Sequence, residues 1–397
     1  MVSAAGSLFY CLLGSPSVSL GAGAFLFGRL GKGSAALRSG VEVSCTVCGR
    51  WKLSILVPPF ISSVPFPSEL LAHSVDLSQL TDRINSALAT LQYGQKPVAL
   101  YEPIRYIMAL GGKRIRPLLT LLGAHIFTDD LEPALKPALA TEVFHNFTLL
   151  HDDLMDQAPL RRGKATVHEK WNPNVAILSG DVMLVRAYEL FLGVQAELLA
   201  YVLGRFSQTA AEVCEGQQWD MNFETETDVS IQQYLDMIRL KTAVLLGFAL
   251  ELGALLGGAS RADADHLRQF GVGIGVAFQL RDDLLDVYGD AATFGKRVGG
   301  DIVSDKKTYL LLMAQAQATN TQRAVLGQYI GQPVIDPEAK VQAIRAIYDE
   351  LEIRPQTEAL INEYFLDALQ HLERVAAPES RKKPLHQLAL QLLEREQ

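Results

Sequence analysis

The sequence predicts an all-α protein, and three observations lead to that prediction. The 159 residues between Pro173 and Pro333 contain no proline, the residue that breaks helices most strongly. Apolar side chains in this stretch recur at three- and four-residue spacing, as in segment 182–192, which is the period of an amphipathic helix. Alternating strand patterns are missing, and so are the Asn-Gly and Asp-Gly pairs of tight hairpins.

Two segments, 241–256 and 270–280, are apolar on nearly every side. Helices of this kind belong in the middle of a large bundle rather than on its surface. No internal repeat of 20–50 residues is apparent, which argues against a solenoid. We therefore expect residues 75–397 to form one large helical bundle.

Composition limits the function classes. With 49% hydrophobic residues the chain can build a core, so wholesale disorder is excluded. A net charge of −8 argues against general nucleic-acid binding, which needs a basic surface. Four cysteines are too few for a disulfide scaffold, and a reducing compartment such as the cytoplasm is expected.

Residues 1–74 differ from the rest of the chain. They carry five basic and two acidic groups, so residues 75–397 hold a net charge of −11. The apolar run near the start is broken by Gly14, Pro16 and Gly21, which argues against a membrane span. A plastid or mitochondrial transit peptide, a disordered extension and a mis-assigned start site remain open for this segment.

A basic turn precedes a predicted helix at residues 111–117, GGKRIRP. It brings Lys113, Arg114 and Arg116 to the helix start, and Pro117 is a favourable first-turn residue. Glycine allows close backbone approach, and a helix N-terminus attracts anions. The turn is a candidate phosphate site, although a solvated basic turn would read the same way.

The first acidic motif lies in TEVFHNFTLLHDDLMD, residues 141–156. At about 100° per residue, His145, Asp152 and Asp156 lie within about 40° of one another on one helical face. Buried carboxylates are costly unless they are paired or bind cations. An oxygen-only set of this kind suits Mg²⁺ that is shared with substrate phosphates. His145 could equally be a hydrogen-bonded core histidine.

A second DDxxD follows in FQLRDDLLD, residues 278–286. It brings Gln279, Asp282, Asp283 and Asp286 to one helical face. The interval of 130 residues between the two motifs accommodates several antiparallel helices. The motifs can therefore face each other across a cavity, where they would repel each other without metal.

Basic residues accompany both acidic motifs. Arg161 and Arg162 follow the first, and a Gly/Lys/Asp-rich stretch with Lys296 and Lys306 follows the second. This stretch lacks the P-loop pattern and is typical of a mobile lid over a cavity. Lys241 and Thr242 lie at the start of an apolar helix. A lysine at this position either belongs to a functional site or extends its ammonium group to water.

Together these motifs resemble the trans-isoprenyl diphosphate synthases of the polyprenyl synthetase family. The resemblance covers roughly residues 80–390 and rests on GGKRIRP, HDDLMDQAPLRRG, LSGD, KT and FQLRDDLLDVYGD, in the family's order. It implies an all-α bundle with a deep central cavity, usually a homodimer.

The resemblance also implies residue roles. The expected catalytic residues are Asp152, Asp156, Asp282 and Lys241, and the expected metal ligands are Asp152, Asp156, Asp282 and Asp286. Residues similar to those that hold isopentenyl diphosphate are Lys113, Arg116, His145 and Arg162. Residues similar to those that hold the allylic diphosphate are Arg161, Lys241, Thr242, Gln279, Lys296 and Lys306.

The implied reaction needs Mg²⁺, with three ions bound beside the allylic diphosphate. They draw electrons from the departing diphosphate and ease ionisation to an allylic cation. Isopentenyl diphosphate then attacks the cation through its double bond, and a proton is lost to the released pyrophosphate. Apolar helix walls keep water away from the cation.

Product length in this family depends on the side chains just before the first DDxxD. Here they are Phe147 and Thr148, one large and one small. This favours fifteen or twenty carbons, with twenty slightly preferred. The first motif has no two-residue insertion, a departure from the typical bacterial farnesyl enzyme.

Three alternatives compete with this interpretation. A class I terpene cyclase also ionises a diphosphate at DDxxD, but it would have no use for a second diphosphate site at GGKRIRP. A di-iron bundle could use the ExxH formed by Glu142 and His145, but it needs a second ExxH, which the sequence lacks. A non-catalytic subunit of a heteromeric synthase could lose its acidic motifs freely, and both are intact here.

Overall fold

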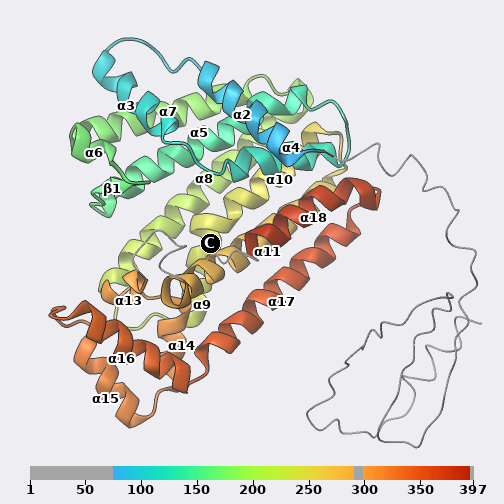
Figure 1. The fold of residues 1–397 in the computed structure, drawn as a ribbon. Coiled ribbons are helices and arrows are strands. Elements are labelled where there is room, and N and C mark those ends of the chain that lie inside the picture. The colour runs from blue at the N-terminus through green and yellow to red at the C-terminus, as the bar shows by residue number, and fades with distance from the viewer. Residues whose placement is uncertain (1–74, 290–297, 394–397) are drawn as a thin grey trace, which may run out of the picture. The chain divides into compact units, whose positions relative to one another are not determined.

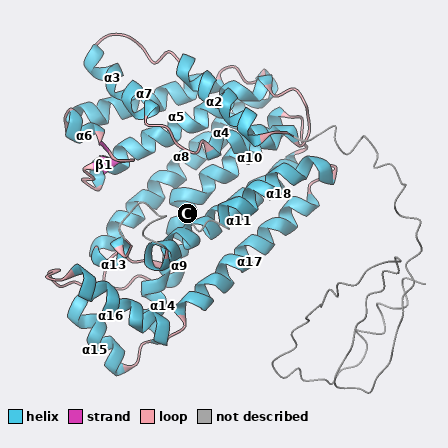
Figure 2. Cartoon of the chain, in the orientation of Figure 1, coloured by secondary structure: helices cyan, strands magenta, loops and turns pink. Residues whose placement is uncertain are grey.

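The structure, a computed structural model, describes residues 75–289 and 298–393. Within these ranges the chain is helical apart from loops and one hairpin of two-residue strands (Figure 1; Figure 2). The all-α prediction is confirmed. All described residues belong to one compact unit.

The first elements surround a long helix, α5. In chain order they are α2 (Leu77–Thr90), α3 (Val98–Ala109), α4 (Ile115–His125), α5 (Glu132–Met155), β1 (Leu160–Arg161), β2 (Lys164–Ala165), α6 (Val167–Lys170) and α7 (Pro173–Phe191). Helix α5 packs against α4 and α7, and a proline in its first turn supports its start. The first acidic motif lies at its C-terminal end, where Asp156 is the capping residue.

The middle of the bundle consists of α8 (Ala196–Thr225), α9 (Ile231–Ile238), the π-helix η2 (Arg239–Ala243), α10 (Val244–Leu256) and α11 (Arg261–Tyr288). Every residue of α10 from Val244 to Leu255 is buried, because α4, α8 and α11 pack around it. The prediction that segment 241–256 occupies the bundle centre is confirmed. Its first residues form the π-turn, which the sequence did not indicate. Segment 270–280 is the middle of α11.

Glycines allow α4 and α10 to pack closely. A Cβ on Gly253 would lie 1.9 Å from the carbonyl oxygen of Thr120, and one on Gly123 would lie 2.7 Å from that of Leu250. Either side chain would push the two helices apart. This packing supports the start of α4, which carries Arg116.

The C-terminal elements that the structure describes follow α11, and several of them contact it. They are α13 (Gly300–Val303), α14 (Tyr309–Gln317), α15 (Asn320–Tyr329), α16 (Pro337–Glu350), α17 (Ile353–Arg374) and α18 (Glu379–Leu393). Helix α17 runs alongside α11 (Figure 1). A second hydrophobic cluster forms here, to which α11 contributes Leu280 and Leu284. These contacts fix the helix that carries the second acidic motif.

Membrane insertion finds no support in the described helices. Within residues 75–289 and 298–393, none combines the length and the apolar character that a membrane crossing requires.

Candidate active site

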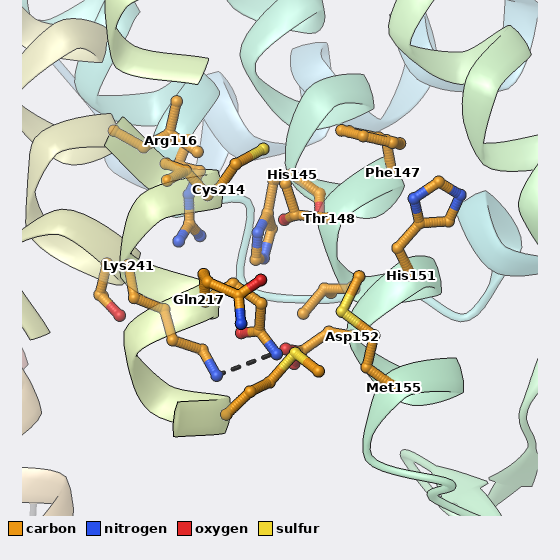
Figure 3. Close-up of a pocket in the computed structure, with 16 residues that line it drawn as sticks. Arg116, His145, Phe147, Thr148, His151, Asp152, Met155, Cys214, Gln217 and Lys241 are labelled. Carbon is orange, nitrogen blue, oxygen red and sulfur yellow. Dashed lines mark hydrogen bonds and ion pairs between the residues drawn. The ribbon is translucent and has the colours of Figure 1, made fainter. Parts of the chain in front are cut away.

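A cavity of about 320 Å³ lies between α5, α8 and the start of α10 (Figure 3). Its walls are largely apolar, and polar groups project into it from several helices. The lining residues that the sequence predicted are Arg116, His145, Phe147, Thr148, Asp152, Lys241 and Thr242. Residues separated by about 120 positions in the chain thus meet in one space.

The first acidic motif faces a lysine across this cavity. The Nζ atom of Lys241 lies 3.4 Å from Oδ1 of Asp152 and 2.6 Å from Oδ2 of Asp220, and Figure 3 shows Lys241 and Asp152 pointing toward each other. Burial acts to lower the pKa of Lys241, but the two carboxylates outweigh it and raise the pKa. Lys241 is therefore a fixed cation at the motif, not a lysine that extends to bulk water.

The π-turn and a glycine place Lys241. Residues Arg239–Ala243 form the π-helix, a distortion that often occurs at functional sites. A Cβ on Gly216 of α8 would lie 2.3 Å from the backbone nitrogen of Lys241. Only glycine at position 216 lets the two segments approach this closely.

The charged form of the Asp156 carboxyl group is disfavoured by its surroundings. Burial, together with the charge of Asp152, raises the pKa of Asp156 to about 6. The two carboxylates are four residues apart on one helical face, so they repel each other. A divalent cation shared between them would relieve that repulsion.

The second aspartate of the first motif plays a different part. Asp153 is 3% exposed. Arg161 donates a hydrogen bond of 2.7 Å from Nε to its Oδ2, and Nη2 forms an ion pair with its Oδ1 at 2.7 Å. The same Nη2 lies 3.9 Å from Asp152. The sequence assigned no role to Asp153, although its position about 100° from Asp152 on the helix could have indicated an inward direction.

The hairpin that carries Arg161 and Arg162 returns the chain to the GGKRIRP turn. Arg162 Nη1 donates to the carbonyl oxygen of Gly111. The phenol of Tyr106 donates to the carbonyl oxygen of Ala165 at 2.7 Å, which anchors the hairpin to α3. One basic residue after the first motif, Arg162, thus contacts the turn before α4.

Arg116 and His145, two of the predicted basic residues, project into the cavity beside the first acidic motif (Figure 3). Burial lowers the pKa of Arg116 to about 10, so the guanidinium is charged at pH 7. Its buried Nε has no hydrogen-bond partner among the described residues. Burial also lowers the pKa of His145 well below its ordinary value, helped by Arg116 and Arg162. His145 is therefore neutral, and Arg116 holds a donor that an anion could satisfy.

Arg114 and Lys113 differ sharply in their surroundings. Arg114 is buried, and its Nη1 lies 2.6 Å from the carboxylate of Glu142, which is also buried. Lys113 is exposed at the turn. Because its carboxylate is paired with Arg114, Glu142 is not available as a ligand of a di-iron site.

In the second motif the middle aspartate is again buried. Asp283 is 3% exposed and accepts a hydrogen bond from the phenol of Tyr234. Burial raises the pKa of Asp283 to about 7, against the effect of this hydrogen bond. Asp282 and Asp286 are only half-buried, and Asp286 accepts the backbone N–H of Asp301 at 2.9 Å.

Lys306 links the two motifs electrostatically. Burial acts to lower its pKa, but the charges of Asp220, Asp301, Asp283 and Asp156 together raise it. Asp156 belongs to the first motif and Asp283 to the second, so Lys306 lies within the field of both. Lys296 and much of the predicted lid, residues 290–297, lie outside the described residues.

The predicted product-length residues lie together on α5. Phe147 is 8% exposed, and its ring is 4.8 Å from that of His151 in an edge-on arrangement. The hydroxyl of Thr148 donates to the carbonyl oxygen of His145 at 2.8 Å, which leaves its methyl group to shape the wall. Both residues line the cavity.

Sequence reasoning missed two polar residues of α8. Gln217 lines the cavity, and its buried Nε2 has no hydrogen-bond partner in the part of the chain that the structure describes. Asp220 binds Lys241. They are three residues apart in CEGQQWD, a helical spacing that could have singled them out.

Protein side chains alone do not form a metal cage here. In the described ranges, no three His, Cys, Asp or Glu side chains are grouped closely enough to hold a metal ion. Mg²⁺ is usually held by one or two carboxylates together with substrate phosphates and water. Asp152 and Asp156 fit that description, because both offer only oxygen ligands and their charges repel each other.

Several known proteins are similar to this chain in sequence and fold. A geranylgeranyl diphosphate synthase from Methanosarcina mazei is 39% identical over 241 residues, which cover 60% of this chain and 74% of the relative. A crystal structure of a geranylgeranyl pyrophosphate synthase matches with a TM-score of 0.77 at 41% identity, covering 82% of this chain and 100% of the other. A third protein, the geranylgeranyl pyrophosphate synthase of Corynebacterium glutamicum, was solved with isoprenyl diphosphate and magnesium. It matches with a TM-score of 0.71 at 29% identity, covering 81% of this chain and 100% of the other.

The match extends to the family as a whole. The model of the polyprenyl synthetase family matches residues 97–350, a range that contains the GGKRIRP turn, the cavity and both acidic motifs. The chain that carries this cavity and both acidic motifs therefore belongs to the polyprenyl synthetase family.

Proposed function

We propose that this enzyme, a short-chain trans-prenyltransferase, condenses isopentenyl diphosphate with an allylic diphosphate in the cavity between α5 and α8. The observation that carries the proposal is the arrangement of charge around an apolar space. Asp152 and Lys241 form an ion pair at the cavity, and Arg116 and His145 also line it. Two diphosphates can thus be held beside one hydrocarbon-binding space.

The acidic side binds the allylic diphosphate. Asp152, Asp156, Asp282 and Asp286 are the proposed Mg²⁺ ligands, with three ions in the full complex. Magnesium bound there supplies charge that stabilises the departing diphosphate. Lys241 adds a fixed positive charge beside Asp152, and Arg161, Thr242, Gln279, Lys296 and Lys306 complete the proposed allylic site.

The basic side binds isopentenyl diphosphate. Arg116 contributes a charged guanidinium whose Nε lacks a partner in the described part of the chain, and Lys113 and Arg162 lie at the same turn and hairpin. A charge-assisted bond to phosphate would satisfy the arginine donor. Neutral His145 donates one ring N–H to a phosphate oxygen and does not act as the proton acceptor.

The apolar wall protects the cation and limits chain growth. Phe147 and Thr148 lie on the first-motif helix, one turn and more before Asp152. We propose that Phe147 forms the floor of the cavity and that the main product has twenty carbons. Water exclusion by the buried helix faces prevents hydrolysis of the cation.

The outer face of α7 exposes apolar side chains. Four large apolar side chains are exposed there, namely Ile177, Leu178, Val185 and Leu192, with exposed fractions of 44%, 57%, 56% and 62%. Exposed apolar patches of this kind mark interaction surfaces. We propose a homodimer through α7, and light scattering on a Val185→Glu variant tests it, because a dimer through this face should become monomeric.

Residues 75–397 carry the whole activity in this proposal, and residues 1–74 are dispensable for catalysis. The cytoplasmic location stays a prediction. A truncated chain that begins at residue 75 should match the full chain in kcat and KM. A large loss of turnover in the truncated protein would contradict this division.

The proposed reaction is tested by the release of pyrophosphate. Release should require both an allylic diphosphate and isopentenyl diphosphate, together with Mg²⁺. Rapid release from the allylic diphosphate alone would instead indicate a terpene cyclase. No release under either condition would favour a non-catalytic subunit.

A further inference from the structure

Tyr234 joins two distant segments at the second acidic motif. It lies on α9, is 1% exposed, and donates its phenolic hydrogen to Oδ2 of Asp283 on α11. Asp283 itself is 3% exposed. A buried carboxylate is costly without a hydrogen-bond donor, so this contact fixes the carboxylate in the core.

A second connection leads from Asp283 to the same part of the chain. Gln279 Nε2 donates to Oδ1 of Asp283 at 3.4 Å, and Thr242 Oγ1 donates to Oε1 of Gln279 at 3.4 Å. Thr242 lies in the π-helix that directly follows α9. Both oxygens of Asp283 are therefore tied to segment 231–243, which also carries Lys241.

The helical geometry links the position of Asp283 to the directions of Asp282 and Asp286. Asp282 and Asp286 are about 40° apart around the axis of α11, and Asp283 lies roughly 60–100° from either. Holding Asp283 in the core adds a polar anchor beside the apolar contacts of Leu280 and Leu284 that fix α11. Asp282 and Asp286, both half-buried, then share one direction.

We propose that Tyr234 is a positioning residue that anchors Asp283 and so holds Asp282 and Asp286 in the orientation that binds a magnesium–diphosphate complex. The inference rests on the proposed function of the second motif. Tyr234 touches neither substrate nor metal in this account. It acts through Asp283, and its effect belongs to Mg²⁺-dependent binding rather than to the basic isopentenyl diphosphate site.

The test compares two ligands in one protein by calorimetry. Pyrophosphate with Mg²⁺ probes the acidic motifs, and isopentenyl diphosphate without metal probes the basic site. The Tyr234→Phe variant should bind magnesium pyrophosphate about tenfold more weakly, the effect typical of lost outer-shell partners. Its affinity for isopentenyl diphosphate should stay within about twofold of the unmodified protein.

Tyr309→Phe is the matched control. Tyr309 is also a buried tyrosine of the second hydrophobic cluster, 7% exposed, and it lies on α14 rather than beside Asp283. The control should leave both affinities unchanged. Equal losses in the two variants, or unchanged magnesium pyrophosphate binding in Tyr234→Phe, would overturn the proposal.

A double variant keeps the test decisive if Tyr234→Phe folds poorly. Asp283→Asn removes the buried carboxyl group to which the phenol donates, and adding Tyr234→Phe to it should then cost little further affinity. An additional tenfold loss would show that Tyr234 acts independently of Asp283 and would refute the positioning role. Failure of the unmodified protein to bind magnesium pyrophosphate would count against the proposed function itself, which separates the two failures.

Discussion

Phe147→Ala tests the floor of the cavity. The ring is 8% exposed and packs edge-on against His151 at 4.8 Å and tilted against Phe144 at 5.6 Å. Aromatic pairs of this kind contribute about 0.5–1.5 kcal/mol each beyond area burial, and truncating a buried phenylalanine costs about 3–5 kcal/mol. Because the freed space joins an existing cavity, we expect a loss near the lower limit, about 3 kcal/mol.

The same change should lengthen the product. One helical turn rises about 5.4 Å, close to the length of an isoprene unit, so removal of a ring one turn deep admits one further unit. We expect the main product to shift from twenty to twenty-five carbons when farnesyl diphosphate and isopentenyl diphosphate are supplied. Chromatography of the dephosphorylated alcohols measures this shift.

Phe144→Ala is the control for that experiment. Phe144 is fully buried on the same helix and packs against Phe147 and Phe206. Its truncation should destabilise the fold at least as much without changing product length. An unchanged product from a folded, active Phe147→Ala enzyme would refute Phe147 as the floor.

Three further predictions concern the charged groups and their support. Asp152→Ala and Asp282→Ala should each lower turnover about a thousandfold, which is the effect of losing electrostatic stabilisation of a transition state. The circular dichroism spectra of both variants should be unchanged. Near-normal turnover in either variant would contradict the metal assignment. Burial and Asp152 raise the pKa of Asp156 to about 6. Protonation of Asp156 should therefore weaken Mg²⁺-dependent pyrophosphate binding as the pH falls from 7 to 5. An affinity that calorimetry finds unchanged over this range would argue against this. Gly216→Ala would place a Cβ 2.3 Å from the Lys241 nitrogen, so it should cost about 1–3 kcal/mol in thermal unfolding and raise KM for the allylic diphosphate. Gly204→Ala on the same helix meets no atom within 4 Å, and it should leave both quantities intact.

The helical period in the sequence was enough to predict which residues share a face. It brought His145, Asp152 and Asp156 together, and the structure places His145 and Asp152 in one cavity. It also identified α10 as a central helix, because a segment without a polar side has to be enclosed. These features depend on local spacing, which the sequence displays directly.

Tertiary partners could not be predicted in the same way. Asp153 and Asp283 belong to the same DDxxD pattern as their neighbours, yet each is buried against a residue from another element, Arg161 and Tyr234. Spacing along one helix indicates a direction but not what lies there. The π-turn at Lys241 likewise depends on the approach of α8 at Gly216, which involves two segments 25 residues apart.

The buried ion pair of Arg114 and Glu142 argues against the di-iron alternative. The ExxH formed by Glu142 and His145 has the spacing of a di-iron ligand pair, but Glu142 is paired with buried Arg114 at 2.6 Å. Breaking such a pair would leave an uncompensated charge in the core, at a cost of about 3–5 kcal/mol. Glu142 therefore stabilises the start of α4, and through it the position of Arg116.

The most direct test of the central claim is product analysis by mass spectrometry. The enzyme would be incubated with Mg²⁺ and with dimethylallyl, geranyl or farnesyl diphosphate as primer, each with and without isopentenyl diphosphate. We predict a twenty-carbon prenyl diphosphate from every accepted primer, and only when isopentenyl diphosphate is present. A cyclised hydrocarbon formed without isopentenyl diphosphate, or no elongation of any primer, would contradict the claim that two diphosphates are joined in this cavity.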